Sequence, residues 1–134
     1  MRIPVLVAVA AAVLLLGACG ASPARRDGAS RAALSFEESL ASGAYGTACG
    51  LLAPDSREQL EEDGSRSCER ALAERKLPRG RTVRSVDVYG RQALLRMDGE
   101  TLFLSQFDDG WRVTAAGCVP EKDDSPHHCA LKGA

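Results

Sequence analysis

The sequence predicts an α+β fold, in which short helices in the first half pack on an antiparallel sheet of four strands in the second. From residue 31 to residue 76 apolar side chains recur at helical spacing, and between residues 83 and 115 they alternate with polar ones. Such alternation is the period of a half-buried strand. Asp98-Gly99 and Asp108-Asp109-Gly110 separate the alternating runs and are hairpin signals. Helices followed by a run of strands are typical of the α+β class.

Four helical segments are expected before the sheet, at residues 31–43, 44–52, 55–64 and 68–76. A glycine or proline stands at or soon after the end of each segment and stops it. Asp55 with Glu58 resembles a capping box, and Ser67 can cap the segment that follows, because these side-chain oxygens can accept from the N–H groups of a first helical turn.

The alternation also assigns the side chains of the sheet to two faces. The apolar face is expected to pack against the helices and carries Val86, Val88, Leu95, Leu102, Leu104, Trp111 and Val113. The opposite face carries Asp87, Leu94, Arg96, Phe103, Ser105, Phe107, Arg112 and Thr114. Among these, Asp87, Arg96 and Arg112 are expected to form a solvated ladder of opposite charges across the strands.

Leu94, Phe103 and Phe107 are unusual on a face that water would reach. Either the C-terminal tail, residues 121–134, folds over them, or they form an interface, since exposed apolar clusters mark interaction sites. The partners of such an interface would be a second copy of the chain or another envelope protein. Both explanations stay open at the level of the sequence.

The first 18 residues have the pattern of an export signal. Met1 and Arg2 give a positive start, and an uninterrupted apolar stretch then runs from Val5 to Leu16. Its 12 residues fall within the roughly 7–15 residues of secretory signals and short of the roughly 20 that a spanning helix needs. We therefore expect residues 1–18 to be a signal peptide.

Leu16-Gly17-Ala18-Cys19, directly after this stretch, resembles the lipobox of bacterial lipoproteins. In that family the cysteine thiol takes a diacylglyceryl group and becomes the first residue of the mature chain. The resemblance implies that Cys19 is the lipid attachment site. Two acyl chains anchor a protein stably where one binds only marginally. The implied localisation is the extracytoplasmic face of the cell membrane.

Residues 19–30 are small and polar and contain a proline, which is the composition of a flexible linker. A linker of this length would reach roughly 20 Å. Within it, Arg25 and Arg26 could meet anionic lipid headgroups or simply be solvated. Residues 31–134 are expected to form a single domain with a disulfide-tied C-terminal tail.

With Cys19 acylated, the other cysteines of an exported chain are Cys49, Cys68, Cys118 and Cys129, which allow three disulfide pairings. We expect Cys49–Cys68 and Cys118–Cys129, because each of these closes a short loop. The crossed pairings would require a helix cysteine to reach the end of the last strand or the tail. Each short loop is expected to contribute about 3 kcal/mol in the chain-entropy treatment.

Composition argues against several classes of function. With 17 basic and 18 acidic residues the net charge is −1, which does not fit a nucleic-acid-binding surface. Motifs such as His-Glu-x-x-His and Gly-x-Ser-x-Gly are absent from the sequence, so no catalytic residue and no cofactor is expected. His127-His128-Cys129 has ligand types that suit zinc or copper. However, adjacent residues rarely all face one ion, and Cys129 is expected in a disulfide, so no metal site is predicted.

Two further stretches look like those of small lipoproteins of GC-rich Gram-positive bacteria: Tyr45-Gly-Thr-Ala-Cys-Gly-Leu-Leu-Ala-Pro54 and Gly110-Trp-Arg-Val-Thr-Ala-Ala-Gly-Cys118. The order of helices before a meander resembles the cone-like fold of the nuclear transport factor 2-like superfamily, with its SnoaL-like and cystatin-like relatives. That superfamily contains both enzymes and binding modules, so the fold does not decide the function. We expect a non-catalytic binding or interaction module, and the alternative is a small SnoaL-like enzyme that uses the cone cavity.

Overall fold

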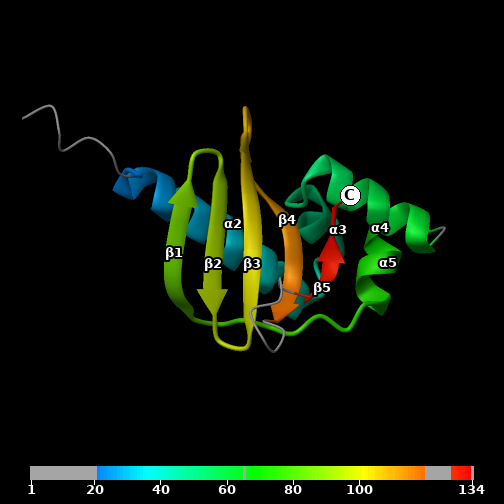
Figure 1. Ribbon diagram of the computed structural model, residues 1–134. Coiled ribbons are helices and arrows are strands. Elements are labelled where there is room, and N and C mark those ends of the chain that lie inside the picture. Colours follow the sequence, from blue (N-terminus) through cyan, green and yellow to red (C-terminus); the bar gives the residue numbers. More distant parts are fainter. Residues whose placement is uncertain (1–20, 65, 120–127, 134) are drawn as a thin grey trace, which may run out of the picture.

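The computed structural model describes residues 21–64, 66–119 and 128–133. The expected signal peptide and Cys19 lie outside these ranges. The described residues form an α+β fold (Figure 1), with helices α2 Pro23–Ser42, α3 Tyr45–Gly50, α4 Pro54–Gly64 and α5 Cys68–Glu74. These are followed by strands β1 Val83–Tyr89, β2 Gln92–Met97, β3 Glu100–Phe107, β4 Gly110–Val119 and β5 His128–Lys132.

Helix α2 starts earlier than the sequence analysis expects, and this corrects the linker predicted over residues 19–30. Ser22 caps the helix, since its Oγ accepts a hydrogen bond from the backbone N–H of Arg25 at 3.3 Å. Pro23 occupies the first turn, where its missing N–H costs nothing. From Pro23 onward the expected linker is therefore the first part of a 20-residue helix.

The short helices agree with the segments that the sequence predicts. Ser67 is the N-cap of α5, and its side chain accepts from the N–H of Arg70. Asp55, in contrast, lies within the first turn of α4 and not at its N-cap.

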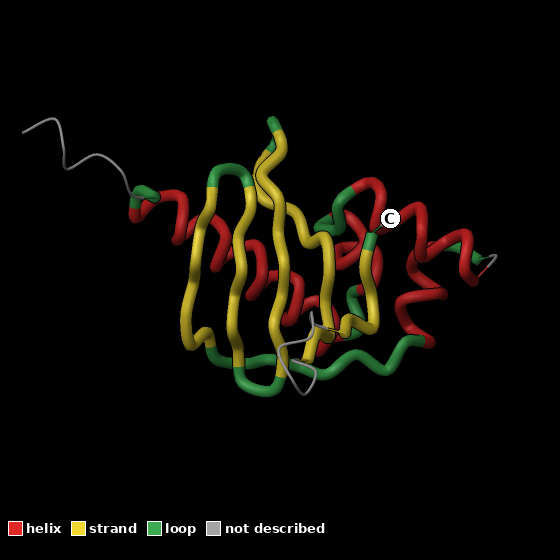
Figure 2. The backbone as a smooth tube through the Cα atoms, in the orientation of Figure 1, coloured by secondary structure: helices red, strands yellow, loops and turns green. Residues whose placement is uncertain are grey.

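The sheet has the order β1-β2-β3-β4-β5, with every neighbouring pair antiparallel (Figure 2). The first four strands are the predicted meander, and Gly99 turns between β2 and β3 with a φ of 83°. The fifth strand corrects the prediction of four. It comes from the tail, and its five residues are too few to give a clear alternating pattern.

The core lies between the sheet and α2, which crosses one face of the sheet diagonally (Figure 1). This inner face carries most of the side chains that the alternation assigned to it. Those in the core cluster are Leu95, Leu102, Leu104, Trp111 and Val113, while Val86 and Val88 are only partly buried at the edge of the cluster. Gly28 brings α2 close to the sheet, because a Cβ at that position would lie 3.1 Å from the Trp111 ring.

Two different segments cover the free edge of β4. The second half of β4 pairs with β5, whereas its first half is bonded to the stretch that joins α3 to α4. There the N–H of Ala53 donates to the carbonyl of Val113 and the N–H of Val113 donates to that of Leu51, each at 2.8 Å. This bridge places the start of α4 beside the sheet.

The structure contains both disulfides that the sequence predicts. Cys49 of α3 is bonded to Cys68 at the start of α5, with a Cα–Cα distance of 6.1 Å. Cys118 of β4 is bonded to Cys129 of β5, and the two residues are register partners in the sheet. One disulfide therefore joins two helices, and the other fastens the tail to the sheet. Within the described ranges no helix is long and apolar enough to cross a membrane.

Candidate functional site

The sheet face opposite α2, called the outer face below, has no helix lying across it in the described part of the chain (Figure 1). A row of register partners crosses it from β1 to β5: Asp87, Leu94, Phe103, Ala115 and Lys132. The row is charged at both ends and apolar in the middle. The apolar cluster that the sequence singled out thus lies at the centre of a face that no described helix covers.

A groove of about 410 Å³ opens on this outer face. One wall is the sheet and the other is the start of α4 together with the end of the tail, and its lining comprises Ala53, Pro54, Asp55, Ser56, Gln92, Phe103, Ser105, Phe107, Thr114, Ala115, Lys132 and Gly133. We call it the outer groove. Small-molecule sites typically enclose about 300–1,000 Å³ and combine an apolar lining with a few polar groups.

The aromatic part of the outer groove comes from β3. Phe103 and Phe107 are both half-buried, so each presents part of its ring to the groove. Leu94 is the register partner of Phe103 on β2 and is also half-buried. Two of the three residues proposed as an interface therefore line one groove, and the third adjoins it.

The polar part of the outer groove is held in place by hydrogen bonds. Ser105 donates to the side chain of Gln92 at 2.8 Å, and Thr114 donates to the carbonyl of Phe103 at 3.0 Å. The pairing of β3 and β4 shifts register beside Phe103, where both Thr114 and Ala115 line the groove. Irregular pairing of this kind is common next to binding sites because it re-aims side chains.

The described part of the tail, residues 128–133, does not lie across the apolar cluster, because it forms the strand beside β4. Residues 128–133 extend the sheet beside β4, and Lys132 and Gly133 form one end of the outer groove. This part of the tail is therefore a wall of the groove, held there by the Cys118–Cys129 disulfide.

The expected charge ladder is shorter than predicted. Arg96 and Asp87 form an ion pair at 2.7 Å across β1 and β2. Arg112 does not join it, because its guanidinium pairs with Asp109 in the preceding turn and also donates to the carbonyl of Gly50. The Asp109 hydrogen bond is the main cause that raises the pKa of Arg112. Arg112 therefore pairs with Asp109 in its own turn and not with a carboxylate on another strand.

A second polar cluster lies inside the domain and was missed by the sequence analysis. Glu37 of α2 and Glu100 of β3 are both buried, and the backbone N–H of Gly80 donates to a carboxyl oxygen of each, at 3.1 and 3.0 Å. The other oxygen of Glu100 accepts from the N–H of Gly117 at 2.8 Å. The two carboxyl groups therefore join α2, the α5–β1 connection, β3 and β4 at one point.

The pKa of Glu37 is raised to about 9, first by burial and then by its hydrogen bond with Glu100 and the charge of that residue. The N–H of Gly80 and the charge of Arg79 act in the opposite direction. At neutral pH Glu37 is therefore protonated. Its helical spacing could have revealed its burial, because it follows the buried Ala33 by four residues and so lies on the same side of α2.

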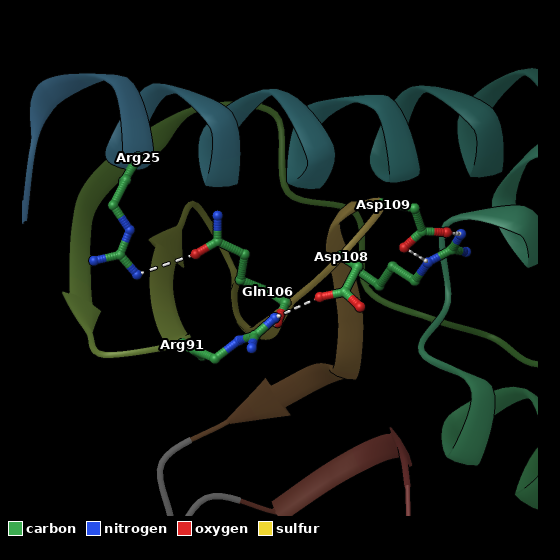
Figure 3. A network of polar contacts seen from close by, with 6 residues as sticks. Arg25, Arg91, Gln106, Asp108 and Asp109 are labelled. Atoms are coloured by element: carbon green, nitrogen blue, oxygen red, sulfur yellow. Dashed lines mark hydrogen bonds and ion pairs between the residues drawn. The ribbon is translucent and has the colours of Figure 1, made fainter.

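A third polar network fixes the start of α2 to the sheet (Figure 3). Arg25 donates to the carbonyl of Gly90 and, at 3.2 Å, to the side chain of Gln106. Its guanidinium also lies 5.9 Å from the centroid of the Trp111 ring, within range of a cation–π interaction. Nearby, Arg91 pairs with Asp108 at 3.4 Å. Arg25 is thus committed to the fold and is not a freely solvated linker residue.

The described residues contain no group of three or more His, Cys, Asp and Glu side chains placed to hold a metal ion. Of the His127-His128-Cys129 stretch, His127 lies outside the described ranges and Cys129 is bonded to Cys118. Comparison of this chain with family models, curated proteins and solved structures found no match.

Proposed function

We propose that this chain is a membrane-anchored extracytoplasmic lipoprotein, attached through Cys19, whose domain is a non-catalytic module that binds a small, largely apolar ligand. The observation that carries the binding role is the outer groove, in which Phe103 and Phe107 are partly exposed on an open, partly polar surface. The anchor rests on the resemblance of Leu16-Gly17-Ala18-Cys19 to a lipobox. The cone-like fold of the nuclear transport factor 2-like superfamily remains part of this proposal.

The chemistry of the groove indicates the kind of ligand. Flat apolar groups fit best against the two phenylalanine rings, where offset or edge-to-face ring contacts are favourable. Gln92, Ser105 and Thr114 supply hydrogen-bonding groups along the floor. Lys132 is exposed at one end, so an anionic group on the ligand would be met there, while Asp55 at the α4 side would disfavour a second negative charge.

The alternative of a small enzyme is favoured by one observation, the buried carboxyl pair of Glu37 and Glu100. The hydrogen bonding of the pair supports a structural role instead. Both oxygens of Glu100 accept from backbone N–H groups, and Glu37 shares one of these donors. Neither carboxyl group lines the outer groove, so a ligand bound there would not meet them.

Binding in the outer groove can be tested with anilinonaphthalene sulfonate, a dye that combines aromatic rings with one anionic group. The wild-type protein is expected to increase the dye's fluorescence saturably, and Phe107→Ser is expected to weaken dye binding several-fold. Lys132→Glu should weaken it too, because it reverses the charge at the end of the groove. Leu34→Ser is the matched control, since Leu34 is an exposed apolar residue on α2, 41% exposed, and lines no part of the outer groove.

Thermal melting of each variant separates loss of the site from loss of the fold. Equal dye binding by wild type and Phe107→Ser would contradict the small-ligand proposal. Sedimentation gives the competing explanation its own readout. A wild-type dimer that Phe103→Ser converts to a monomer would mean that a second copy of the chain occupies the apolar cluster, and would overturn the small-ligand role.

A further inference from the structure

We infer that one end of the domain is held against the membrane surface, and that this end consists of the first turn of α2 with the β1–β2 and β3–β4 turns. The inference rests on the proposed lipid attachment at Cys19. It names the surface of the domain that meets the lipid headgroups, which the proposed function leaves open. Its occupant is the bilayer that carries the acyl chains of the anchor.

Only a short stretch of chain lies between the proposed anchor at Cys19 and the folded domain. Because the helix begins at Pro23 and Ser22 caps it, only three peptide units separate Cys19 from the N-cap. A chain covers at most about 3.6 Å per residue, so the start of α2 lies within roughly 11 Å of the lipidated cysteine along any path. Helix α2 itself, at 20 residues, is about 30 Å long. The tether is thus much shorter than the domain.

The first turn of α2 is attached to the sheet through Arg25. Arg25 is bonded to Gly90 in the β1–β2 turn and to Gln106 near the end of β3, and its guanidinium lies over Trp111 at the start of β4. Figure 3 shows the contact between Arg25 and Gln106. Together these contacts fasten the first helical turn to the strands that flank the two turns. A tether that holds the first turn of α2 at the membrane therefore also holds the β1–β2 and β3–β4 turns there.

The side chains exposed at this end suit a headgroup layer. Tyr89 is 65% exposed, and tyrosine is a residue that favours the boundary between water and lipid. Arg26 is exposed on the first turn of α2, and Arg91 is exposed in the β1–β2 turn. The three acids Asp27, Asp108 and Asp109 equal in number the three basic residues of this end, Arg25, Arg26 and Arg91. The covalent tether, and not a basic patch, therefore sets the orientation. Helices α4 and α5 lie beyond the β5 edge of the sheet, at the far end of the sheet from the start of α2 (Figure 1), and are therefore farther from the anchor.

The experiment uses the full-length lipidated protein in phosphatidylcholine vesicles that carry a headgroup spin label. Two tryptophan reporters are compared in the native background: Tyr89→Trp at the proposed membrane end and Glu62→Trp on α4. Trp111 contributes the same background to both, since it is the single native tryptophan. Tyr89→Trp is expected to be quenched several-fold more strongly than Glu62→Trp.

A longer tether provides the control. A Gly-Ser spacer of about 12 residues between Ala21 and Ser22, with a reach of roughly 20 Å, should remove most of the difference between the two reporters. Equal quenching of both reporters with the native tether would overturn the inference while leaving the anchor intact. Mass analysis of the N-terminal peptide reads the anchor separately, and an unmodified Cys19 would overturn the anchor and this inference together.

Discussion

At the scale of single residues, the carboxyl groups of Glu37 and Glu100 connect parts of the chain that are far apart in sequence. Both accept a hydrogen bond from the backbone N–H of Gly80. A Cβ atom at position 80 would lie only 2.8 Å from the Cβ of Met97, so only glycine fits there. The α5–β1 connection therefore passes close to the core and is held there by hydrogen bonds to buried acids. Oε1 of Glu37 has no hydrogen-bond partner among the described residues, which is a cost that protonation of this carboxyl reduces.

Rising pH is expected to destabilise the domain through Glu37. The folded state keeps the Glu37 proton up to a pKa of about 9, whereas the unfolded chain releases it near 4.5. Between these values the folded state binds more protons, so the free energy of unfolding falls as pH rises, by up to about 1.4 kcal/mol per pH unit. Glu37→Gln cannot ionise and retains an amide that can donate to Glu100. Its stability should therefore depend less on pH.

Urea unfolding of both proteins between about pH 5 and pH 9 measures this dependence. Glu38→Gln is the control, because Glu38 is an exposed neighbour on the same helix and should keep the wild-type slope. A wild-type stability that stays constant or increases over this range would contradict the assignment of the raised pKa to Glu37.

At the scale of elements, the sequence predicts the helices of the first half and the first four strands because each has a strong period and a clear stop signal. The start of α2 and strand β5 were not predicted. The start of α2 was missed because residues 19–30 have the composition of a linker, although Ser22 and Pro23 form a local helix-start signal. Strand β5 was missed because its position depends on pairing with β4 and on Cys129, which are long-range constraints.

The outer groove was also predicted only in part. Alternation within strands predicted that Phe103 and Phe107 share the outer face, and they do line the groove. Its opposite wall comes from Pro54, Asp55 and Lys132. These residues reach it only through the bridge between Leu52 and Val113 and through the pairing of β5. The alternation within one strand predicts which side chains share a sheet face. The second wall of a groove depends on which segments pack beside that strand, and the alternation does not contain this information.

The second prediction concerns β5, which only a short strand pairing and one disulfide hold in place. Replacing Cys118 and Cys129 together by Ser is expected to lower the free energy of unfolding by about 3 kcal/mol, since the disulfide closes a loop of few residues in the unfolded chain. Loss of β5 pairing would also leave the second half of β4 as an open edge. Hydrogen exchange in Ala115–Val119 should therefore accelerate in the double variant.

The matched control is the corresponding double variant of Cys49 and Cys68, which should lose a similar stability and keep slow exchange in β4. Peptide mapping of the oxidised wild type under non-reducing conditions checks the pairing itself. A cross-linked peptide that joins Cys49 or Cys68 to Cys118 or Cys129 would contradict it.

At the scale of the whole molecule, the anchor, the domain and the groove form one arrangement. The proposed lipid lies next to the first turn of α2, and the outer groove extends along β3 toward Phe107, which borders the β3–β4 turn at the proposed membrane end. A ligand in this groove would therefore lie close to the lipid surface. This favours compounds that partition from the membrane over those that arrive from free solution.

The prediction at this scale is that Cys19→Ala abolishes fatty-acid labelling of the protein and leaves the precursor uncleaved before residue 19. The uncleaved precursor keeps its apolar Val5–Leu16 stretch and should stay in the detergent phase through that stretch, so labelling and cleavage are the readouts that report on Cys19. Cys49→Ala serves as a control that removes a different cysteine and should keep both labelling and cleavage. Unchanged detergent partitioning of Cys19→Ala, with cleavage intact, would rule out lipid attachment at this residue.

The contact between Gly28 of α2 and Trp111 of β4 also bears on when the protein can fold during its synthesis. The ribosome makes α2 first among the described elements and β4 almost last, so the longest helix has no sheet to pack on until most of the chain exists. Contacts this distant in sequence form slowly, because the intervening loop must close before they contribute any stability. A nascent chain that ends before Trp111 lacks the strand on which α2 and Arg25 converge. Helix α2 is therefore expected to complete its packing only after β4 has been made, which is compatible with the export proposed above.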